Sequence, residues 1–337
     1  MKREHKKGTG TLGKVIGRFE GKKVCVIGDI IADVYIFGKP YRLSREAPVV
    51  IVKFEESKTY PGSAGNTINN LLALGAHVYP LGFIGNDNAG EKLMQSFSQH
   101  KNIDIGGLIR HDGETVTKTR ILAGDTNTSK QQVIRIDKDS NRPLSRSEKT
   151  MLMKKLKAVA PLADAFIVSD YGHGTIDKEV MDFMRNLAKK KIVVGDSRYG
   201  LEAFNGFTIV TPNESEAYRL SNLSEDHDIN IVGKTIMGRM KLKALLITRG
   251  NKGMRLFVGG RRIYNIPISG TDDVTDVTGA GDTVCATIAL SLAGRADFYT
   301  ASRIANYAAG VVVMKRGTAT VTVQELERAI GNQDELQ

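Results

Sequence analysis

One octapeptide, residues 276–283, combines the residue types of an anion-binding helix start. It reads DVTGAGDT and continues into an apolar segment, Val284 to Ala293, that is long enough for a helix. The start of a helix has unpaired backbone amides and the positive end of the helix dipole, so it can hold an anion. The small residues Gly279, Ala280 and Gly281 would let the backbone approach that anion closely.

Asp282 places a negative charge where such an anion would lie. This makes sense if the carboxylate is a base that takes a proton from a hydroxyl group, which then attacks a phosphoryl group held by the same amides. The alternative is that Asp282 is an acidic residue of the first helical turn, which is common. From the octapeptide alone, the capping role is the slightly better interpretation.

The elements that would position this octapeptide follow a βα alternation. Short apolar segments such as Lys23 to Gly28 and Ala165 to Ser169 have the pattern of buried strands, and segments such as Arg146 to Val159 have a helical pattern. Strands that alternate with helices predict an α/β fold with a mostly parallel sheet covered on both faces. No G-x-G-x-x-G follows the first strand and no G-x-x-x-x-G-K-[ST] is present, which disfavours a dinucleotide oxidoreductase and a P-loop.

Polar residues follow several of the predicted strands. In an open α/β sheet the carboxyl ends of the strands form the ligand-binding edge, so these residues predict a crevice. Asp29 could instead cap a turn. The residues are Asp29 and Asp33, Asp170, Asp196, Asn213 and Glu216, and Thr248, Arg249 and Gly250.

Asn213 and Glu216 lie three residues apart at a predicted helix start. They share a face and could reach a hydrated Mg²⁺ or the phosphates it carries. The same spacing is that of a capping box, which is at least as good an interpretation.

Two β-like regions interrupt the alternation, at about 33–60 and 113–138. They have no helices of their own, so we interpret them as one small sheet inserted in two pieces that could close a site against water. Partly apolar sheet faces often find a partner, so the lid also predicts a homodimer.

Composition limits the partners. The net charge is +11, from 48 Lys and Arg against 37 Asp and Glu, which suits phosphorylated small ligands as well as polyanions. The absence of Trp disfavours a stacking surface for nucleic acid. Residues 1–21 have the composition of a flexible basic tail. No apolar leader or membrane-spanning run is visible, so we expect a cytoplasmic protein without membrane partners.

Three stretches together resemble the PfkB, or ribokinase-like, sugar kinases: GSAGN at 62–66, Asn213-x-x-Glu216, and DVTGAGD at 276–282. The resemblance extends from about residue 22 to 329 and implies a kinase domain over 22–337 with a β-sheet lid. It implies ATP and Mg²⁺ as cofactors, with Glu216 near Mg²⁺ through water. A monovalent cation such as K⁺ is left open. Asp282 would be the base, and the amides of residues 279–282 the anion hole.

Finer features resemble the D-glycero-D-manno-heptose 7-phosphate kinase group of that family, which acts in lipopolysaccharide precursor synthesis. They include RLSREAPV at 42–49, TKTR at 117–120 and GTATV at 317–321. The group forms heptose 1,7-bisphosphate from its substrate. The resemblance implies sugar contacts at Asp33, Gly62 and Asn66, with Ser63 and Asp170 as further candidates, and nucleotide contacts at Asn213, Glu216, Thr248, Gly250, Gly253 and Asn306.

A substrate that already carries a phosphate needs a cationic pocket. Arginine can hold a phosphate with two parallel hydrogen bonds. The candidates are Arg42, Arg45, Lys118, Arg120 and Arg198. Three positions depart from the group's usual residues, namely Arg45 for proline, His173 for lysine, and Ser197-Arg198 for Pro-Lys. These departures concern the approaches to the substrate and the nucleotide rather than the reaction.

Other interpretations of the function stay open. The same chemistry could act on ribose, a fructose phosphate or a nucleoside such as adenosine, and a non-catalytic sugar-binding relative is a further class. No His-x-Gly-His follows the kinase region, so we expect a separate nucleotidyltransferase to act on the product.

Overall fold

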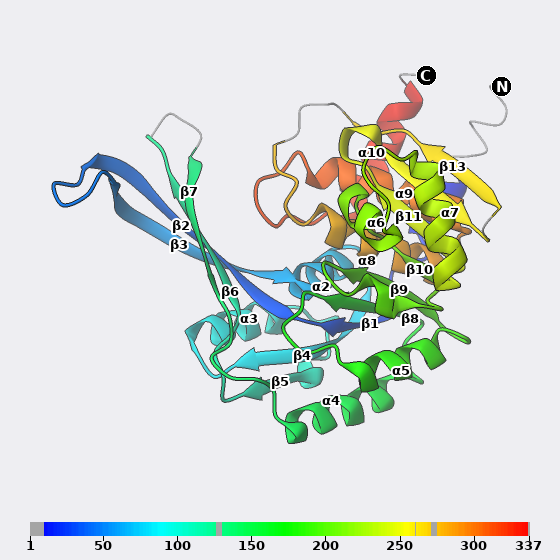
Figure 1. Ribbon diagram of the computed structural model, residues 1–337, viewed down its shortest axis with the longest axis horizontal. Helices are drawn as coiled ribbons and strands as arrows, with labels where there is room; N and C mark the ends of the chain where they lie inside the picture. The colour runs from blue at the N-terminus through cyan, green and yellow to red at the C-terminus, as the bar shows by residue number, and fades with distance from the viewer. Residues whose placement is uncertain (1–9, 126–129, 260, 271–274, 336–337) are drawn as a thin grey trace.

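The structure is a computed structural model that describes residues 10–125, 130–259, 261–270 and 275–335. Within these ranges the chain forms a nine-stranded sheet and a separate four-stranded sheet. Figure 1 shows the small sheet projecting from the body that the large sheet and its helices form.

The large sheet has the strand order β13-β12-β11-β10-β9-β8-β1-β4-β5. All neighbouring strands from β5 to β11 in this order are parallel. At the other edge, β12 pairs antiparallel with β11, and β13 pairs antiparallel with β12. The strands are β1 Lys23–Gly28, β4 His77–Gly85, β5 Leu108–His111, β8 Ala165–Asp170, β9 Ile192–Ser197, β10 Ile209–Val210, β11 Ala244–Thr248, β12 Met254–Val258 and β13 Arg262–Ile266.

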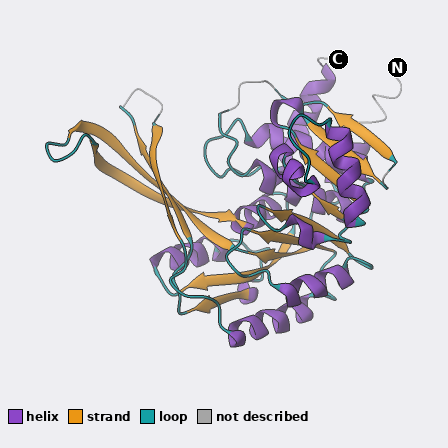
Figure 2. Ribbon diagram, viewed as in Figure 1, coloured by secondary structure: helices purple, strands orange, loops and turns teal. Residues whose placement is uncertain are grey.

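Helices cover both faces of this sheet (Figure 2). Side chains of a strand alternate between faces, and in β1 Val24 and Val26 join one apolar cluster whereas Cys25 and Ile27 join the other. The first cluster includes residues of α2 Ala64–Ala73, α3 Asn88–Ser98, α8 Ala280–Ala293, α9 Phe298–Val312 and α10 Val323–Glu335. The second includes residues of α4 Arg146–Val159, α5 Lys178–Leu187, α6 Glu214–Ser221 and α7 Ile229–Met240.

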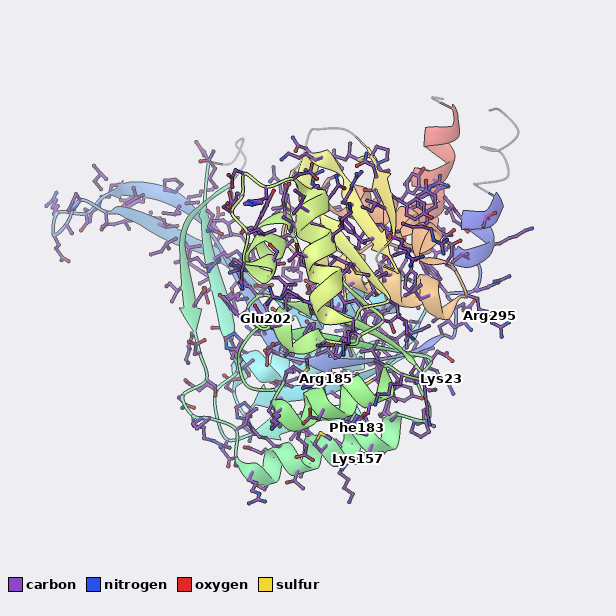
Figure 3. All side chains as sticks on the ribbon, turned by 45° about the vertical axis from the view of Figure 1, so that its right-hand side comes forward. Lys23, Lys157, Phe183, Arg185, Glu202 and Arg295 are labelled. Atoms are coloured by element: carbon purple, nitrogen blue, oxygen red, sulfur yellow. The ribbon has the colours of Figure 1, made fainter. Side chains whose placement is uncertain are left out.

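Charged residues lie on the outer sides of these helices. Lys157 of α4 is exposed, and Arg185 of α5 forms an ion pair with Asp182 at 3.0 Å (Figure 3). Among the helices of the described residues, none is both long enough and apolar enough to cross a bilayer.

The small sheet is the lid, with strand order β3-β2-β6-β7. It consists of β2 Ile30–Leu43, β3 Val50–Ser63, β6 Thr117–Ala123 and β7 Gln131–Lys138. Thus the two inserted regions do lie in one sheet, but β2 and β3 are longer than the expected 33–60. Their inner ends are rooted in the body, because Ile30, Ile31 and Ala32 are buried and pair with residues 61–63 of β3.

The expected flexible tail over 1–21 is wrong for its second half. Residues 10–16 form a helix, and Leu12, Ile16 and Phe19 are buried in the first apolar cluster. Leu12 and Ile16 are spaced to share one helix face, and Phe19 follows the helix, so together they hold the segment against the body. Residues 1–9, which carry most of the expected basic tail, lie outside the described residues.

Candidate active site

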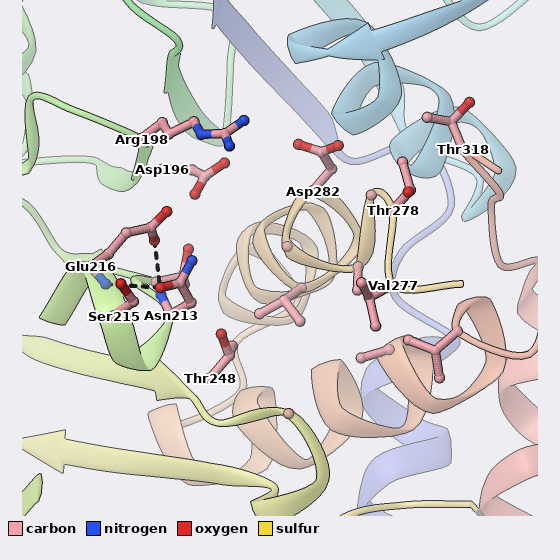
Figure 4. A pocket seen from close by; sticks show the side chains of 18 of the residues that line it. Asp196, Arg198, Asn213, Ser215, Glu216, Thr248, Val277, Thr278, Asp282 and Thr318 are labelled. Atoms are coloured by element: carbon pink, nitrogen blue, oxygen red, sulfur yellow. Dashed lines mark hydrogen bonds between the residues drawn. The ribbon is translucent and has the colours of Figure 1, made fainter. Parts of the chain in front are cut away.

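A cavity of about 870 Å³ lies between the inner lid and the carboxyl ends of the parallel strands. Its walls come from the lid strands β2, β6 and β7, the segments that follow β8 to β11, and α8 and α9. Figure 4 shows Asp282 at the start of α8, with Asp196, Asn213 and Glu216 on the other side of the pocket. Cavities of this size accommodate small organic ligands.

The glycine-rich octapeptide forms the start of α8. Gly279 is the N-cap with φ 80°, a left-handed conformation that favours glycine, and a Cβ there would lie 2.3 Å from Nδ2 of Asn66. The amide of Ala280 donates to the carbonyl of Val277 at 3.2 Å, so it is already engaged. As first-turn residues, Gly281 and Asp282 have amides without an intrahelical acceptor.

Gly281 has a different reason to be glycine. A Cβ at this position would meet no heavy atom within 4 Å, and the residue lines the cavity. The protein's own packing therefore does not require glycine here. The free space beside the first-turn amides fits an anionic group of a ligand, as the octapeptide predicts.

Asp282 is a buried carboxylate, 5% exposed, that lines the cavity. Its Oδ2 accepts a hydrogen bond from Nδ2 of Asn66 at 2.8 Å, and its Oδ1 accepts from the hydroxyls of Tyr171 at 3.1 Å and Thr67 at 3.4 Å. Burial raises the pKa of Asp282 to about 6, although the hydrogen bonds from Asn66 and Tyr171 oppose the rise. A carboxylate with such a pKa suits a general base near neutral pH.

Tyr171 was missed by the reasoning from sequence. It follows β8, and its backbone amide donates to Oδ2 of Asp29 at 2.8 Å. Asp29 also accepts from the amides of His173 and Thr175, so its carboxylate caps the loop rather than facing a ligand. The only signal in the sequence was the strand-end position of Asp170 directly before it.

The lid side of the cavity is built around Asp33. Its Oδ1 accepts a charge-assisted hydrogen bond from Arg120 at 2.5 Å, and both side chains are largely buried. A Cβ on Gly62 would lie 2.2 Å from Oδ2 of Asp33, so only glycine leaves room for this carboxylate. Ser63, the N-cap of α2 with φ 53°, lines the same cavity.

Lys118 stands next to this pair. Its Nζ lies 5.1 Å from the centre of the Tyr171 ring, and it lines the cavity together with Arg135 and Arg198. Burial lowers the pKa of Lys118, and the charge of Arg198 acts in the same direction. Within the described parts of the chain, neither Lys118 nor Arg198 forms an ion pair, although the charges of Asp33 and Asp137 oppose the effect of burial on the pKa of Lys118.

Asn213 and Glu216 form the capping box that was the alternative interpretation. Oδ1 of Asn213 accepts from the amide of Glu216 at 2.8 Å, and Oε2 of Glu216 accepts from the amide of Asn213 at 2.9 Å. Both residues also line the cavity, so the cap does not remove them from the site.

The other expected nucleotide residues lie on the same side. Thr248, Gly250, Gly253 and Asn306 all line the cavity. Gly253 has φ 76°, and Nδ2 of Asn306 donates to the carbonyl of Pro267 at 2.9 Å, which holds a wall segment in place.

Carboxylates on this side fit a hydrated divalent cation. Burial raises the pKa values of Glu216 and Asp196, and for Asp196 the nearby charges of Asp282 and Glu216 add to the rise. A cation would relieve this repulsion, and oxygen donors are those that Mg²⁺ prefers. No group of three or more His, Cys, Asp or Glu side chains that could hold a metal occurs in the described residues.

The expected substrate residues Arg42, Arg45 and Asp170 do not line the cavity. Arg42 is exposed on β2, nine positions beyond Asp33, and at about 3.3 Å per residue this lies roughly 30 Å away along the strand. Arg45 is exposed beyond the end of the same strand. Asp170 is used structurally, because its carboxylate accepts from Oγ of Ser197 at 3.2 Å and from the amide of Gly172 at 3.0 Å, which joins the loops after β8 and β9.

Comparison with known proteins gives a consistent family. A sequence model described as pfkB family carbohydrate kinase matches residues 21–325. The chain is 36% identical over 314 residues to the bifunctional protein HldE of Geobacter sulfurreducens and 36% identical to that of Trichlorobacter lovleyi. Each alignment covers 91% of this chain but only 63% and 62% of these relatives, so the chain spans less than two thirds of their length.

Solved structures show the same fold. The ribokinase of Arabidopsis thaliana complexed with ribose and ATP superposes with a TM-score of 0.70 at 18% identity, over 92% of this chain and 99% of that one. Phosphofructokinase-2 of Escherichia coli in complex with potassium gives 0.75 at 15% identity, over 93% and 99%. The predicted fold class, a ribokinase-like α/β sheet with a small β lid, is confirmed.

Proposed function

Because the chain belongs to the pfkB family of carbohydrate kinases, we propose a reaction and a substrate for the cavity beneath its lid. The reaction is transfer of the γ-phosphoryl group of ATP to a hydroxyl of a sugar phosphate. The proposed substrate is D-glycero-D-manno-heptose 7-phosphate, which would give heptose 1,7-bisphosphate for lipopolysaccharide precursor synthesis. The relatives named HldE and the sequence features at 42–49, 117–120 and 317–321 support this choice.

The observation that carries the reaction is a buried carboxylate directly beside the first-turn amides of α8. Asp282 takes the proton of the sugar hydroxyl as its oxygen bonds to the γ-phosphorus, the bond to the β–γ bridging oxygen breaks, and ADP leaves. The amides of Gly281 and Asp282, with the positive end of α8, stabilise the charge of the transferring group. Closure of the lid would exclude water from this step.

Glu216 would hold Mg²⁺ through water, on the side of the cavity that Asn213 and Thr248 share. The ion, when bound, would neutralise charge on the ATP phosphates. Oε2 of Glu216 already accepts the amide of Asn213 at the start of α6. The other carboxylate oxygen is therefore the one that would accept from a water bound to Mg²⁺.

Two cations of the cavity, Lys118 of the lid and Arg198 of the loop after β9, support a substrate that already carries a phosphate. Both line the cavity, and their like charges oppose each other there. A phosphate between them would remove this repulsion and form charge-assisted hydrogen bonds. A neutral sugar such as ribose would leave it in place.

The lid also supports a homodimer. Its strands expose apolar side chains that the body does not cover, and a second copy of the chain is the proposed partner. These side chains are Tyr41, Leu43, Val49, Val50, Phe54, Tyr60, Val133, Ile134 and Ile136. Since the reaction draws on ATP, the expected compartment is the cytoplasm.

The test is a measurement of ADP release and of the phosphorylated product with heptose 7-phosphate, fructose 6-phosphate, ribose and adenosine, each with and without K⁺. We expect kcat/KM for the heptose phosphate to exceed the others by at least about tenfold. A preference for an unphosphorylated acceptor would contradict the substrate. ATP binding without transfer to any acceptor would contradict the reaction.

Substitutions of two cavity cations show whether they bind the phosphate of the sugar or the phosphates of ATP. Lys118→Ala and Arg198→Ala should raise the KM of the sugar phosphate more than that of ATP. Arg185→Ala, on α5, is the matched control, because Arg185 pairs with Asp182 and does not line the cavity. A larger effect on ATP would assign these cations to the nucleotide instead.

A further inference from the structure

Tyr171 contacts Asp282, the proposed base, from the loop after β8. Asn66 and Thr67, which also donate to Asp282, come from α2. That loop is fixed from within, since the carboxylate of Asp29 accepts the amides of residues 171, 173 and 175 at 2.8, 3.1 and 3.2 Å. The Tyr171 hydroxyl is therefore presented to the cavity by a held backbone.

The two oxygens of Asp282 have different partners. Oδ2 accepts from Asn66, whose backbone carbonyl in turn accepts from Nδ2 of Asn70 at 3.0 Å, so this side is tied to α2. Oδ1 accepts from Tyr171 at 3.1 Å, and Thr67 is the longer contact at 3.4 Å. Without the Tyr171 hydroxyl, the orientation of Oδ1 would depend on the weaker of its two donors.

Two carboxylates act on the Tyr171 phenol. Burial raises its pKa, and the charges of Asp282, to which the hydroxyl donates, and of Asp196 raise it further. The hydroxyl therefore stays protonated and can donate. The titratable groups that act on Asp282 or share its surroundings are Asp33 of β2, Lys118 of β6, Tyr171, Asp196 of β9, and Cys285 of α8.

We propose that Tyr171 is a positioning residue for phosphoryl transfer: its hydroxyl holds Oδ1 of Asp282, while Asn66 holds Oδ2. The base thereby keeps its charge and one orientation toward the acceptor hydroxyl. This inference rests on the proposed function of Asp282 as the base. It adds a residue to which the sequence analysis assigned no role.

The test is Tyr171→Phe, which keeps the ring beneath Lys118 and removes only the hydroxyl. Loss of a donor to the charged base should move the acid limb of the pH profile of kcat/KM upward by about 0.5 to 1 pH unit. At pH 8, kcat should fall about tenfold while the KM of ATP stays unchanged. Tyr299→Phe on α9 is the matched control and should leave the profile in place, since Tyr299 is partly exposed and does not line the cavity.

A purely structural role of Tyr171 would lower activity equally at all pH values. A profile of Tyr171→Phe that coincides with the wild type, or a loss of kcat without displacement of the acid limb, would overturn the inference. Asp282→Asn separates the two proposals. If that variant is inactive while Tyr171→Phe behaves as wild type, the proposed reaction stands and only the role of Tyr171 falls.

A second variant tests the same oxygen without a change at Tyr171. Thr67→Val removes the longer donor to Oδ1, so it should move the acid limb in the same direction by less than about 0.5 pH unit. A larger displacement than this would mean that Thr67 is the main donor, which contradicts the assignment to Tyr171. The unfolding midpoint of each variant, compared with the wild type, shows that the fold is intact.

Discussion

Nδ2 of Asn66 lies 2.8 Å from Oδ2 of Asp282, although 216 residues separate them in the chain. The contact joins the starts of α2 and α8, two helices that both open with small residues. Gly279 permits this approach, because a Cβ there would occupy the position of the Asn66 amide. The two glycine-rich stretches therefore form one site rather than two.

Asp282→Asn should lower kcat by at least about 100-fold, because the acceptor hydroxyl loses its base. ATP binding should change little, since the residues proposed to bind the nucleotide on the opposite wall are untouched. Steady-state kinetics and a nucleotide-binding titration measure the two effects. Asp112→Asn, at a highly exposed carboxylate, is the control and should behave as wild type. Turnover near the wild-type rate in Asp282→Asn would remove the proposed mechanism.

The pH dependence of activity should report the raised pKa of Asp282. With a pKa of about 6 in the folded protein, the base is protonated below that pH and charged above it. We therefore expect kcat/KM to fall below about pH 6 and to level off above pH 7. A profile that stays flat down to pH 4.5 would contradict this assignment.

The contribution of Asp282 to the free energy of unfolding should decrease with rising pH, whereas its contribution to activity increases. Its pKa rises from 3.8 to about 6 on folding, so the folded state binds the proton more tightly. The stabilisation is fully present below pH 3.8 and is lost as pH rises through 6. Asp282→Asn should therefore be more stable than wild type at pH 8, by at most about 3 kcal/mol, and should gain little near pH 4. Urea unfolding at both pH values measures the difference.

Two alanine substitutions in the glycine run should have different effects. Gly281→Ala should leave stability unchanged or raise it by up to about 1 kcal/mol, because the residue is helical and its Cβ meets nothing. It should still lower kcat/KM by about 100-fold by crowding the transferring group. Gly279→Ala should instead destabilise the fold, because of its positive φ and its clash with Asn66. Thermal unfolding beside kinetics separates these cases, and an active Gly281→Ala would argue against an anion at this position.

Arg120→Met should leave Asp33 buried without its partner. The expected loss is about 3 kcal/mol in the free energy of unfolding, together with a higher KM for the sugar phosphate. The double variant with Asp33→Asn should recover most of the stability but not the KM. If the single variant unfolds like the wild type, the pair is not the buried contact described above.

Phe54→Asp on the lid should shift the protein toward the monomer, because it places a charge on the exposed apolar face. Sedimentation velocity over a range of concentrations measures this change. Met151→Asp on α4 is the matched control, since Met151 is also an exposed apolar residue but lies away from the lid. A protein that is monomeric before any substitution would contradict the proposed dimer.

The α/β fold could be predicted from the sequence because the patterns of strands and helices are determined by residues close together in the chain. The strand-end rule likewise brought Asp33, Asn213, Glu216 and Thr248 toward one cavity. The reasoning from sequence failed for Arg42, which was chosen as an arginine that could hold a phosphate, since a position within a strand pattern does not tell how far that strand extends from the body.

It also failed where the outcome depends on a loop conformation. Asp29 and Asp170 follow strands as a ligand-binding carboxylate would, yet both hold backbone amides of the loop after β8. Tyr171 gained its contact with Asp282 through that loop. No spacing in the sequence encodes it, because residues 171 and 282 come from separate strand–helix units.

Strand β2 extends from the buried Ile30 to the exposed Leu43, with register shifts against β3 after Phe37 and after Pro40. To the extent that it moves as one body, such a strand is a lever with Asp33 near its pivot. The arm beyond Asp33 has ten residues, about 33 Å at 3.3 Å per residue. A rotation of about 10° at Asp33 would displace Leu43 by about 6 Å over such an arm. Small angular changes at the buried Asp33–Arg120 contact would thus correspond to large displacements of the lid tip, and a force on the tip would act as a torque on the Asp33 carboxylate, which lines the cavity.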